Sequence, residues 1–557
     1  MKKLIECVPN FSEGNDEVII KQITDQVETV KGVRLVDVDP GKATNRTVVT
    51  FVGTPDEVVE AAFRAIKKAT ELIDMSKHHG AHPRFGATDV CPFVPVSNIT
   101  MEETVEYAHK LAERVGNELN IPVYCYEFAA STEERKSLAF CRSGEYEGLK
   151  DKLSKPEWKP DFGPAEFIPK TGAIAIGARN FLVAYNFNLN TTSTRRANAI
   201  AFDVREAGRL KKVNGKQVKD ENGNPVRIPG TLKKTRAIGW YIKEYGIAQI
   251  SMNLTDISVT PVHIAFDEVC EKARARGIRV TGSELVGVIP LKAMLDAGKY
   301  FLKKQQRSVG IPDREIIKIA VKSLGLDELY PFDPDKKIIE YILEDKTKEN
   351  LVDMTLTDFA DETASESPAP GGGSISAYIG ALGAALGTMV ANLSSHKRGW
   401  DDRWEEFSDW AEKGKSYQTE LIKMVDEDTN AFNKIMDAFG LPKKTEQEKI
   451  ERKAAIQQAT KFAIEVPFKT MNLCFESMQV MKAMAEIGNP NSVSDAGVGA
   501  LAARSGVIGA FLNVKINAAG LDDKEFVEDI LNKSMKIVEK TKALENEILE
   551  IVNDKIN

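Results

Sequence analysis

Cysteine is scarce in this sequence, and no two cysteines have the spacing of a metal-binding or redox pair. The 557 residues contain six cysteines, at positions 7, 91, 125, 141, 270 and 474. Scattered cysteines without a C-x-x-C pair argue against a disulfide framework and a zinc site, and they favour reduced thiols in a cytosol. We therefore expect a cytoplasmic protein.

A surplus of positive charge is also missing. The net charge is −7, with both signs interspersed along the chain, which provides no basic surface for nucleic acid. The first nine residues reach an acid before any apolar run develops, so no secretory signal is expected. Residues 367–395 carry no charge and could cross a bilayer by length, but glycine and serine dilute them. We expect a soluble protein with no nucleic-acid partner and no membrane span.

The first part of the chain alternates strand-like and helix-like patterns. So long a chain exceeds one hydrophobic core, and the order β-α-β-β-α-β is typical of ferredoxin-like α+β layers. The expected strands are 4–8, 33–38, 46–52 and 89–96 and the helices 16–30 and 55–73, extended by a helix at 101–119 and a strand at 122–128.

A related order follows residue 169. Residues 211–230 are polar with two Asn-Gly pairs, which predicts an exposed hairpin insertion. Two similar halves would meet at an interface, a common place for a ligand cleft. The expected elements are strands at 173–176, 181–189, 237–242, 247–253 and 279–288, and helices at 195–207 and 261–276.

The pattern becomes helical after a charged stretch at 344–349. Long helices are expected from residue 355 onward, with Pro467 breaking or kinking one of them. The predicted fold is α+β, with two ferredoxin-like α/β layered subdomains, followed by an all-α helical-bundle domain. The predicted boundaries are 1–181 and 182–342 for the subdomains, 343–351 for a linker and 352–557 for the helical domain.

Three of the six histidines, His78, His79 and His82, lie in the glycine-containing segment HHGAHPRFGATD. The segment follows a helix and precedes a strand, so it is a loop, where functional groups tend to lie. Surface or packing histidines are the simpler interpretation. A zinc site is a third one, although the spacing matches no known ligand pattern.

A second polar cluster, DVDPGKATNR, forms a turn between two expected strands at residues 37–46. Alternation predicts that Leu35, Asp37 and Asp39 share one strand face. An acid at a strand end can orient a histidine. Simple turn chemistry explains the same residues.

Four segments of the first part carry a resemblance. CVPNFSEG, DVDPGKATNRTVVTFVG, HHGAHPRFGATDVCPFVPV and DFGPAEFIPKTGAIAIGARNFLVAYNFNLN resemble glutamate formimidoyltransferase, over nearly all of residues 1–342. The resemblance implies that His82 is the catalytic base and that Asp39 supports it. It also implies folate-binding positions at Gly163, Pro164, Ala165, Glu166, Phe167, Ile168, Pro169, Lys170, Thr171, Gly172, Asp203, Val204 and Arg205.

The implied reaction suits these residue types. The N5 amine of tetrahydrofolate attacks the formimino carbon of N-formimino-L-glutamate, and a neutral histidine can take the N5 proton. Asp39 would hold the imidazole tautomer. From chemistry alone, Arg84 or Arg46 could pair with the substrate carboxylates.

One acid in the helical part stands out by its position. Leu421, Met424, Val425, Phe432, Ile435 and Phe439 define the apolar stripe of a helix expected at 419–439. At about 100° per residue, Asp428 falls in the middle of that stripe, whereas Asp426 projects to the opposite face and is expected to be solvated. Burial of Asp428 requires a partner, so the sequence leaves two roles open for it, structural and catalytic.

Two glycine-rich segments precede expected helices. PAPGGGS at 368–374 could cradle an anion or let a flat ligand approach, although it lacks the lysine and spacing of a P-loop. Residues 488–499 could be a helix start capped by Ser494 or Asp495, or the rim of a site.

The helical part carries a resemblance of its own. PAPGGGSISAYIGALGAALGTMVANL, VDEDTNAFN and GNPNSVSDAGVGALAARSG are similar to formimidoyltetrahydrofolate cyclodeaminase, over residues 352–557. The aspartate of that activity corresponds to Asp428, whose implied role is acid/base catalysis as N10 attacks the formimino carbon and ammonia leaves. Neither half requires a metal or a tightly bound cofactor. Tetrahydrofolate, with or without a polyglutamate tail, is the expected co-substrate.

The leading hypothesis is a bifunctional folate enzyme of histidine degradation, a transferase and an ammonia-lyase, acting on small molecules. Glycine- and alanine-rich helices predict close helix contacts and a homo-oligomer. One competing hypothesis is a metallohydrolase that uses the histidine cluster. The other is a folate-binding assembly protein without activity, because matching folds need not retain function.

Overall fold

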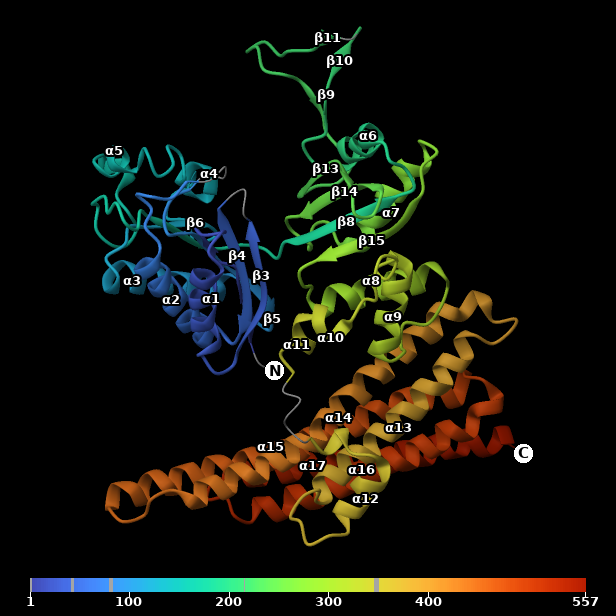
Figure 1. The fold of residues 1–557 in the computed structure, drawn as a ribbon. Coiled ribbons are helices and arrows are strands. Elements are labelled where there is room, and N and C mark those ends of the chain that lie inside the picture. The colour runs from blue at the N-terminus through green and yellow to red at the C-terminus, as the bar shows by residue number, and fades with distance from the viewer. Residues whose placement is uncertain (1–2, 42–44, 80–83, 215, 345–349, 557) are drawn as a thin grey trace. The chain divides into compact units, whose positions relative to one another are not determined.

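The structure is a computed structural model, shown in Figure 1, which describes residues 3–41, 45–79, 84–214, 216–344 and 350–556. The chain forms two compact units. The first consists of Met1–Ala297 with Ala320–Glu344, and the second of Gly298–Ile319 with Asp345–Asn557. Each unit contains hydrophobic clusters of its own.

The first unit begins with a seven-stranded sheet. Its antiparallel part runs β5-β1-β4-β3, which is the ferredoxin-like strand order that the pattern of the sequence predicts. The short β2 pairs with both β4 and β5. The strands are β1 Leu4–Cys7, β2 Asn10–Phe11, β3 Val33–Gly41, β4 Arg46–Gly53, β5 Thr88–Ser97, β6 Val123–Glu127 and β7 Ile174–Ala178.

The last strand of the first sheet comes from the apolar run at residues 173–176. The element pattern grouped this run with the order that follows residue 169, although the predicted boundary at residue 181 leaves it in the first subdomain. The grouping is wrong, because β7 pairs in parallel with β5 and β6 and completes the first sheet. Parallel strands pair although they lie far apart in sequence, and the apolar pattern of a strand does not show which other strand it pairs with. The second half therefore begins with β8.

Helices α1, α2 and α3 cover one face of the first sheet (Figure 1). The sequence specifies their ends: Asp16 accepts the N–H groups of Val18 and Ile19 at the start of α1, and Thr100 and Glu103 form a capping box on α3. Beneath them lies a core that includes Phe51, Phe93 and Val115. The helices are α1 Glu17–Glu28, α2 Pro55–Leu72 and α3 Met101–Glu118, followed by the short α4 Leu138–Cys141 and α5 Leu149–Leu153.

The second sheet is four-stranded, antiparallel and also ferredoxin-like, in the order β13-β14-β8-β15. The predicted insertion is confirmed as two short exposed ladders, β9 with β12 and β10 with β11. The elements are β8 Val183–Leu189, α6 Thr194–Val204, β9 Arg209–Leu210, β10 Lys212–Val213, β11 Lys216–Gln217, β12 Arg227–Ile228, β13 Thr235–Ile242, β14 Ile247–Leu254, α7 Val262–Arg274, β15 Val280–Val286, α8 Leu291–Lys304, α9 Asp313–Leu324, α10 Pro334–Lys337 and α11 Ile339–Ile342.

The remainder is helical, as predicted. Helix α15 runs without a break through Pro467, so of the two predicted effects, a break or a kink, the break is wrong. The proline is buried, and the carbonyl of Ala463, which its missing N–H group leaves free, accepts Nδ2 of Asn517 at 2.7 Å. The helices are α12 Leu356–Thr363, α13 Gly372–Ser395, α14 Trp404–Gly440, α15 Glu446–Ile487, α16 Val493–Ala518 and α17 Lys524–Ile556.

Two of these segments are apolar and long enough to cross a membrane by length and composition. They are Gly372–Ser395 and Pro490–Ala518, whose most apolar windows are 61% and 44% buried inside the structure. Buried core helices of water-soluble proteins pass the same test, so the signal is weak evidence for a membrane span.

Candidate active sites

The predicted acid Asp39 lies on β3 beyond a β-bulge. Leu35 pairs with Phe51 and Asp37 with Thr50, so two residues of β3 advance while β4 advances one. The bulge reverses the alternation: Leu35 packs on the core, whereas Asp37 and Asp39 are exposed on the other sheet face. The prediction that Leu35 shares their face is wrong, because the alternation rule assumes an unbroken ladder.

Asn45, which lies just before β4, joins three segments of this region. Its side-chain oxygen accepts the N–H of Gly14 at 2.9 Å and Nδ2 of Asn15 at 2.8 Å, and its own Nδ2 donates to the carbonyl of His79 at 2.9 Å. Its main-chain carbonyl lies 2.8 Å from Nε2 of His78. Asn45 has a φ of 49°, a conformation that asparagine tolerates. Sequence reasoning placed Asn45 in the polar turn but assigned it no role.

The three clustered histidines have different positions. His78 is 7% exposed and burial lowers its pKa, so it is a packed, neutral histidine, while His79 is exposed. His82 lies outside the described residues, and its catalytic role stays a prediction. Within the described part of the chain, which leaves His82 out, no group of three or more His, Cys, Asp or Glu side chains could hold a metal ion.

The two arginines proposed for substrate carboxylates have different surroundings. The guanidinium of Arg84 pairs with Glu147 and lies 5.6 Å from the ring centre of Tyr146. Arg46 approaches Asp89 instead, with 3.9 Å between Nε and Oδ2. The fork of Arg84 therefore already has a carboxylate partner.

Glu6, on β1, is a buried carboxyl that sequence reasoning missed. It pairs with Val52 of β4, which places it on the same sheet face as Asp39, and it is 5% exposed. Burial raises the pKa of Glu6 to about 7, opposed by the nearby Arg179. The signal available in the sequence is an acid inside the apolar run LIECV.

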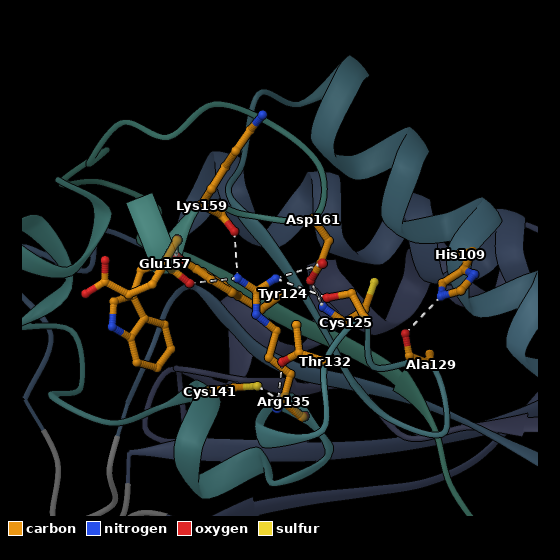
Figure 2. Close-up of polar contacts among 12 residues, drawn as sticks. His109, Tyr124, Cys125, Ala129, Thr132, Arg135, Cys141, Glu157, Lys159 and Asp161 are labelled. Carbon is orange, nitrogen blue, oxygen red and sulfur yellow. Dashed lines mark hydrogen bonds and ion pairs between the residues drawn. The ribbon is translucent and has the colours of Figure 1, made fainter. Parts of the chain in front are cut away.

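The predicted folate-binding segment 163–172 is a loop held at both ends. Figure 2 shows the contacts before its start: Arg135 pairs with Asp161 at 2.7 Å and donates to the carbonyl of Lys159 at 2.7 Å, and Asp161 accepts the N–H of Cys125 at 2.7 Å. At its end, Gly172 has a φ of 66° and a side chain there would lie 2.5 Å from the carbonyl oxygen of Phe85.

Between these ends the loop presents backbone and exposed side chains. Tyr146 donates to the carbonyl of Pro169 at 2.6 Å, and the N–H of Met75 donates to the carbonyl of Lys170 at 2.9 Å. Ala165, Glu166, Pro169 and Lys170 are exposed. An anchored loop with an accessible middle suits the binding of a flat ligand.

Residues 203–205, also predicted to bind folate, lie beside the second sheet. Asp203 forms ion pairs with Arg209 and Arg276, and the Val204 side chain is buried. Arg205 donates to the carbonyls of Gly208 at 3.0 Å and Ala237 at 3.3 Å. The side chains of this segment are therefore engaged within their own layer, while residues 163–172 lie against the first sheet.

In the helical unit, the structure brings Asp428 of α14 to the N-terminus of α13. Oδ2 of Asp428 accepts the main-chain N–H of Ser374 at 2.9 Å and its hydroxyl at 3.3 Å. The same hydroxyl donates to the carbonyl of Val425 at 2.8 Å and lies 3.4 Å from Oγ1 of Thr429. The glycine-rich segment and the acid, singled out separately in the sequence, thus form one site.

Two opposing effects act on the protonation of Asp428. Burial raises the pKa of this carboxyl, and the two hydrogen bonds from Ser374 oppose the increase. Gly373 makes the close approach possible, because a Cβ atom there would lie 2.0 Å from Oδ1 of Asp428. Asn513 of α16 borders the same helix start, 3.4 Å from where a Cβ of Gly372 would lie.

The surroundings of α14 differ from the sequence prediction in two respects. Asp426 is half-buried, and its Oδ1 accepts the N–H of Leu351 at 2.7 Å, so the expectation of a merely solvated acid is wrong. Phe432 and Phe439, expected in the buried stripe, are 40% and 50% exposed. A helical projection shows which side of the helix a residue lies on, but it does not show how far along the helix the neighbouring elements extend to cover that side.

The second glycine-rich segment is capped by a residue other than those predicted. Asn489 accepts the N–H of Asn491 at 3.3 Å ahead of α16, and Ser394 accepts the N–H of Asn489 at 2.8 Å. Ser494 and Asp495 lie within the first turn of α16, so neither is the N-cap. The cap prediction was wrong because a short 3₁₀ turn precedes the helix.

Family models match three parts of the chain. Residues 4–179 match the formiminotransferase domain, N-terminal subdomain; residues 184–344 match the formiminotransferase domain; and residues 355–536 match formiminotransferase-cyclodeaminase.

The chain is also similar to proteins of known name. It is 44% identical to formimidoyltransferase-cyclodeaminase of Gallus gallus, over 97% of each chain. It is 42% identical to formimidoyltransferase-cyclodeaminase of Dictyostelium discoideum, over the full length of both. Over 54% of this chain and 94% of the relative, it is 40% identical to glutamate formimidoyltransferase of Streptococcus pyogenes serotype M1.

Proposed function

This chain belongs to the formimidoyltransferase-cyclodeaminase family, and we propose that it carries out two successive steps of histidine degradation. It transfers the formimino group from N-formimino-L-glutamate to tetrahydrofolate, and it then cyclises 5-formimidoyltetrahydrofolate to 5,10-methenyltetrahydrofolate with release of ammonia. The similarity to relatives named for both activities, at 42–44% identity over 97–100% of their length, carries the proposal.

In the transferase step, N5 of tetrahydrofolate attacks the formimino carbon, and the bond from that carbon to the glutamate nitrogen breaks. The resemblance assigns the N5 proton to His82, which passes a proton to the departing glutamate nitrogen. Asp39 would orient the imidazole. Its exposed position beyond the bulge, on the same sheet face as Glu6, supports access to a ligand on that face.

In the cyclodeaminase step, N10 attacks the same carbon and the formimino nitrogen leaves as ammonia. Asp428 would protonate that nitrogen, and its anion would stabilise the cationic amidine. Its position supports this role, because burial raises the pKa of the carboxyl while the N-terminus of α13 stabilises the anion. A carboxyl with a raised pKa holds a proton more readily than an ordinary aspartate, and the helix N-terminus favours its anion once the proton has left.

The experiment supplies formiminoglutamate and tetrahydrofolate to the purified chain and follows methenyltetrahydrofolate absorbance together with ammonia. Both products are expected. If neither appears, the proposal fails, and folate affinity without ammonia would favour the non-enzymatic assembly protein instead. Metal analysis of protein purified without a nickel column tests the metallohydrolase hypothesis.

We further propose that the protein is a cytoplasmic homo-oligomer with no tightly bound cofactor. None of its six cysteines forms a disulfide, which suits a reducing compartment. Helices α13 and α16 approach closely: a Cβ at Gly383 would lie 2.7 Å from the carbonyl oxygen of Gly499. Both helices also carry exposed apolar side chains, which are Leu382, Met389, Leu393, Val498, Leu501, Leu512 and Ile516.

Exposed apolar side chains on two neighbouring helices suit burial against a second copy of the chain. Analytical ultracentrifugation is expected to show an oligomer, and Leu512→Glu with Ile516→Glu is expected to shift it toward monomer. A monomeric wild-type chain would contradict the oligomer. Cell fractionation tests the location.

A further inference from the structure

Two arginines in the first unit share one buried carboxylate. Arg46, at the start of β4, and Arg142, which follows α4, both reach Oδ2 of Asp89. Asp89 is 1% exposed in its side chain, and the two arginines are 22% and 15% exposed. Among the described residues of this cluster, two positive charges face one negative charge, and the surplus is largely withdrawn from water.

Each of these arginines has a donor that is not used. The Nε atoms of Arg46 and Arg142 are buried, and the described part of the chain offers neither of them a hydrogen-bond acceptor. Burial lowers the pKa of Arg46; Asp89 opposes this effect and Arg142 adds to it. Leaving charged donors buried and unsatisfied is costly, so the arrangement suits an anion that completes it.

The cluster borders both predicted parts of the transferase site. Arg46 pairs with Gly41, two residues along β3 from Asp39, so Arg46 and Asp39 share a sheet face. It also follows Asn45, which holds the segment of His78 and His79.

Asp89 lies near the end of the predicted folate loop. The N–H of Ala87 donates to the carbonyl of Thr171 at 2.8 Å, and Gly86 bridges to Gly172. The unused donors therefore belong to a cluster that neighbours both the strand of Asp39 and the end of the predicted folate loop.

We propose that Arg46 and Arg142 form a subsite for a carboxylate of a glutamyl group, a role that rests on the proposed transferase function. The forked guanidinium fits a carboxylate bidentately. Asp89 pre-orients both forks and neutralises one charge, and the ligand neutralises the other. Formiminoglutamate and the glutamate tail of tetrahydrofolate both carry this chemistry.

The test measures the KM of each substrate in Arg46→Gln and Arg142→Gln. The KM for one glutamyl substrate is expected to rise at least about 10-fold with little change in kcat, because a charged hydrogen bond is lost in the ground state and the transition state alike. A higher KM for formiminoglutamate assigns the subsite to the donor. If the KM rises for tetrahydrofolate but not for tetrahydropteroate, which lacks the glutamate, the subsite binds the glutamate tail of tetrahydrofolate.

Two further variants distinguish binding from folding. Arg64→Gln removes an exposed arginine of α2 that pairs with Glu60, and it should change neither KM. The triple variant Arg46→Gln, Arg142→Gln and Asp89→Asn removes all three charges, so it leaves no buried charge of the cluster without a partner. If the cluster only supports the fold, this variant regains the wild-type KM; if the cluster binds a carboxylate, its KM stays raised.

Changes in both KM values of less than about twofold in folded Arg46 and Arg142 variants would overturn the subsite. A wild-type chain that transfers no formimino group would instead refute the proposed function. In that case, titration calorimetry with L-glutamate and tetrahydrofolate decides the subsite separately: loss of binding in Arg46→Gln supports it, and unchanged or absent binding overturns it.

Discussion

The carboxylate of Asp428 accepts the main-chain N–H of Ser374 at 2.9 Å, so an acid on α14 caps the N-terminus of the neighbouring helix α13. A helix N-terminus stabilises a carboxylate by about 0.3–1 kcal/mol. Burial of the charge costs several kcal/mol, and the net result is a raised pKa for Asp428. Structural and catalytic roles are therefore compatible at this residue.

Asp428→Asn should remove ammonia release and spare formimino transfer. The amide keeps an acceptor oxygen for Ser374 but cannot deliver a proton, so cyclodeaminase kcat is expected to fall by at least about 100-fold. Ammonia and methenyltetrahydrofolate are measured alongside glutamate release. Asp426→Asn is the matched control on the same helix, and full deaminase activity in Asp428→Asn would refute the role.

Ser374→Ala tests the hydrogen bonds separately from the acid. It removes the hydroxyl that lowers the pKa of Asp428 and keeps the main-chain N–H. The limb of the cyclodeaminase pH profile set by Asp428 should move to higher pH, with kcat at its optimum changed less than about 10-fold. Ser505→Ala, at an exposed position of α16, serves as the control. An unchanged pH profile would show that the Ser374 hydroxyl does not set the limb.

Gly373→Ala should separate the helix start from Asp428. The added Cβ would lie 2.0 Å from Oδ1, so α13 or the carboxylate must shift, at a cost of about 1–3 kcal/mol. Deaminase activity should fall and the melting temperature should decrease. Gly440→Ala has open space around its Cβ and should preserve both. Equal behaviour of the two variants would contradict the close approach.

Glu6→Gln should change how stability depends on pH. The folded pKa of about 7 lies above the ordinary value of 4.5, so the native state retains a proton that the unfolded chain releases between these values. Wild-type stability therefore falls as pH rises from about 4.5 to 7. Glutamine removes this contribution, which amounts to about 3 kcal/mol at most above pH 7. Hydrogen exchange of peptides from β1 measures the stability of the wild type and the variant at each pH. If the stability of the two depends on pH in the same way, the raised pKa of Glu6 is refuted.

His82→Ala should abolish formimino transfer while leaving deamination of supplied 5-formimidoyltetrahydrofolate intact. Loss of one acid/base group reduces turnover by at least about 100-fold. Glutamate release from formiminoglutamate is the measurement, and His79→Ala is a neighbouring control. Formimino transfer near the wild-type rate in His82→Ala would refute the role of His82 as the catalytic base.

Local pattern predicted most of the elements of this protein. Alternation and helical period located β1, α1, β4 and α2 within a few residues, and in the structure the side chains of Asp16 and Thr100 cap α1 and α3. These signals are local because a strand face, a helix face or a cap depends on residues at most a few positions apart. Asp428 was selected in the same way.

Pairing between distant segments was beyond the same reasoning. The bulge between Leu35 and Asp37 depends on the register with β4, and the placement of β7 depends on β5 and β6. Arg142 joins Arg46 at Asp89 across about a hundred residues of chain. The periodicity of the sequence does not predict such contacts, because they depend on how helices and strands pack against one another.

The sequence by itself determined the kinds of elements, their order and the acid on α14, because each rests on neighbouring residues. Only the tertiary structure decided that Asp428 caps α13 through Ser374, that Asn45 holds the histidine segment and that two arginines share Asp89. Those relationships depend on distances between residues remote in sequence, and burial then sets the charge that each group carries.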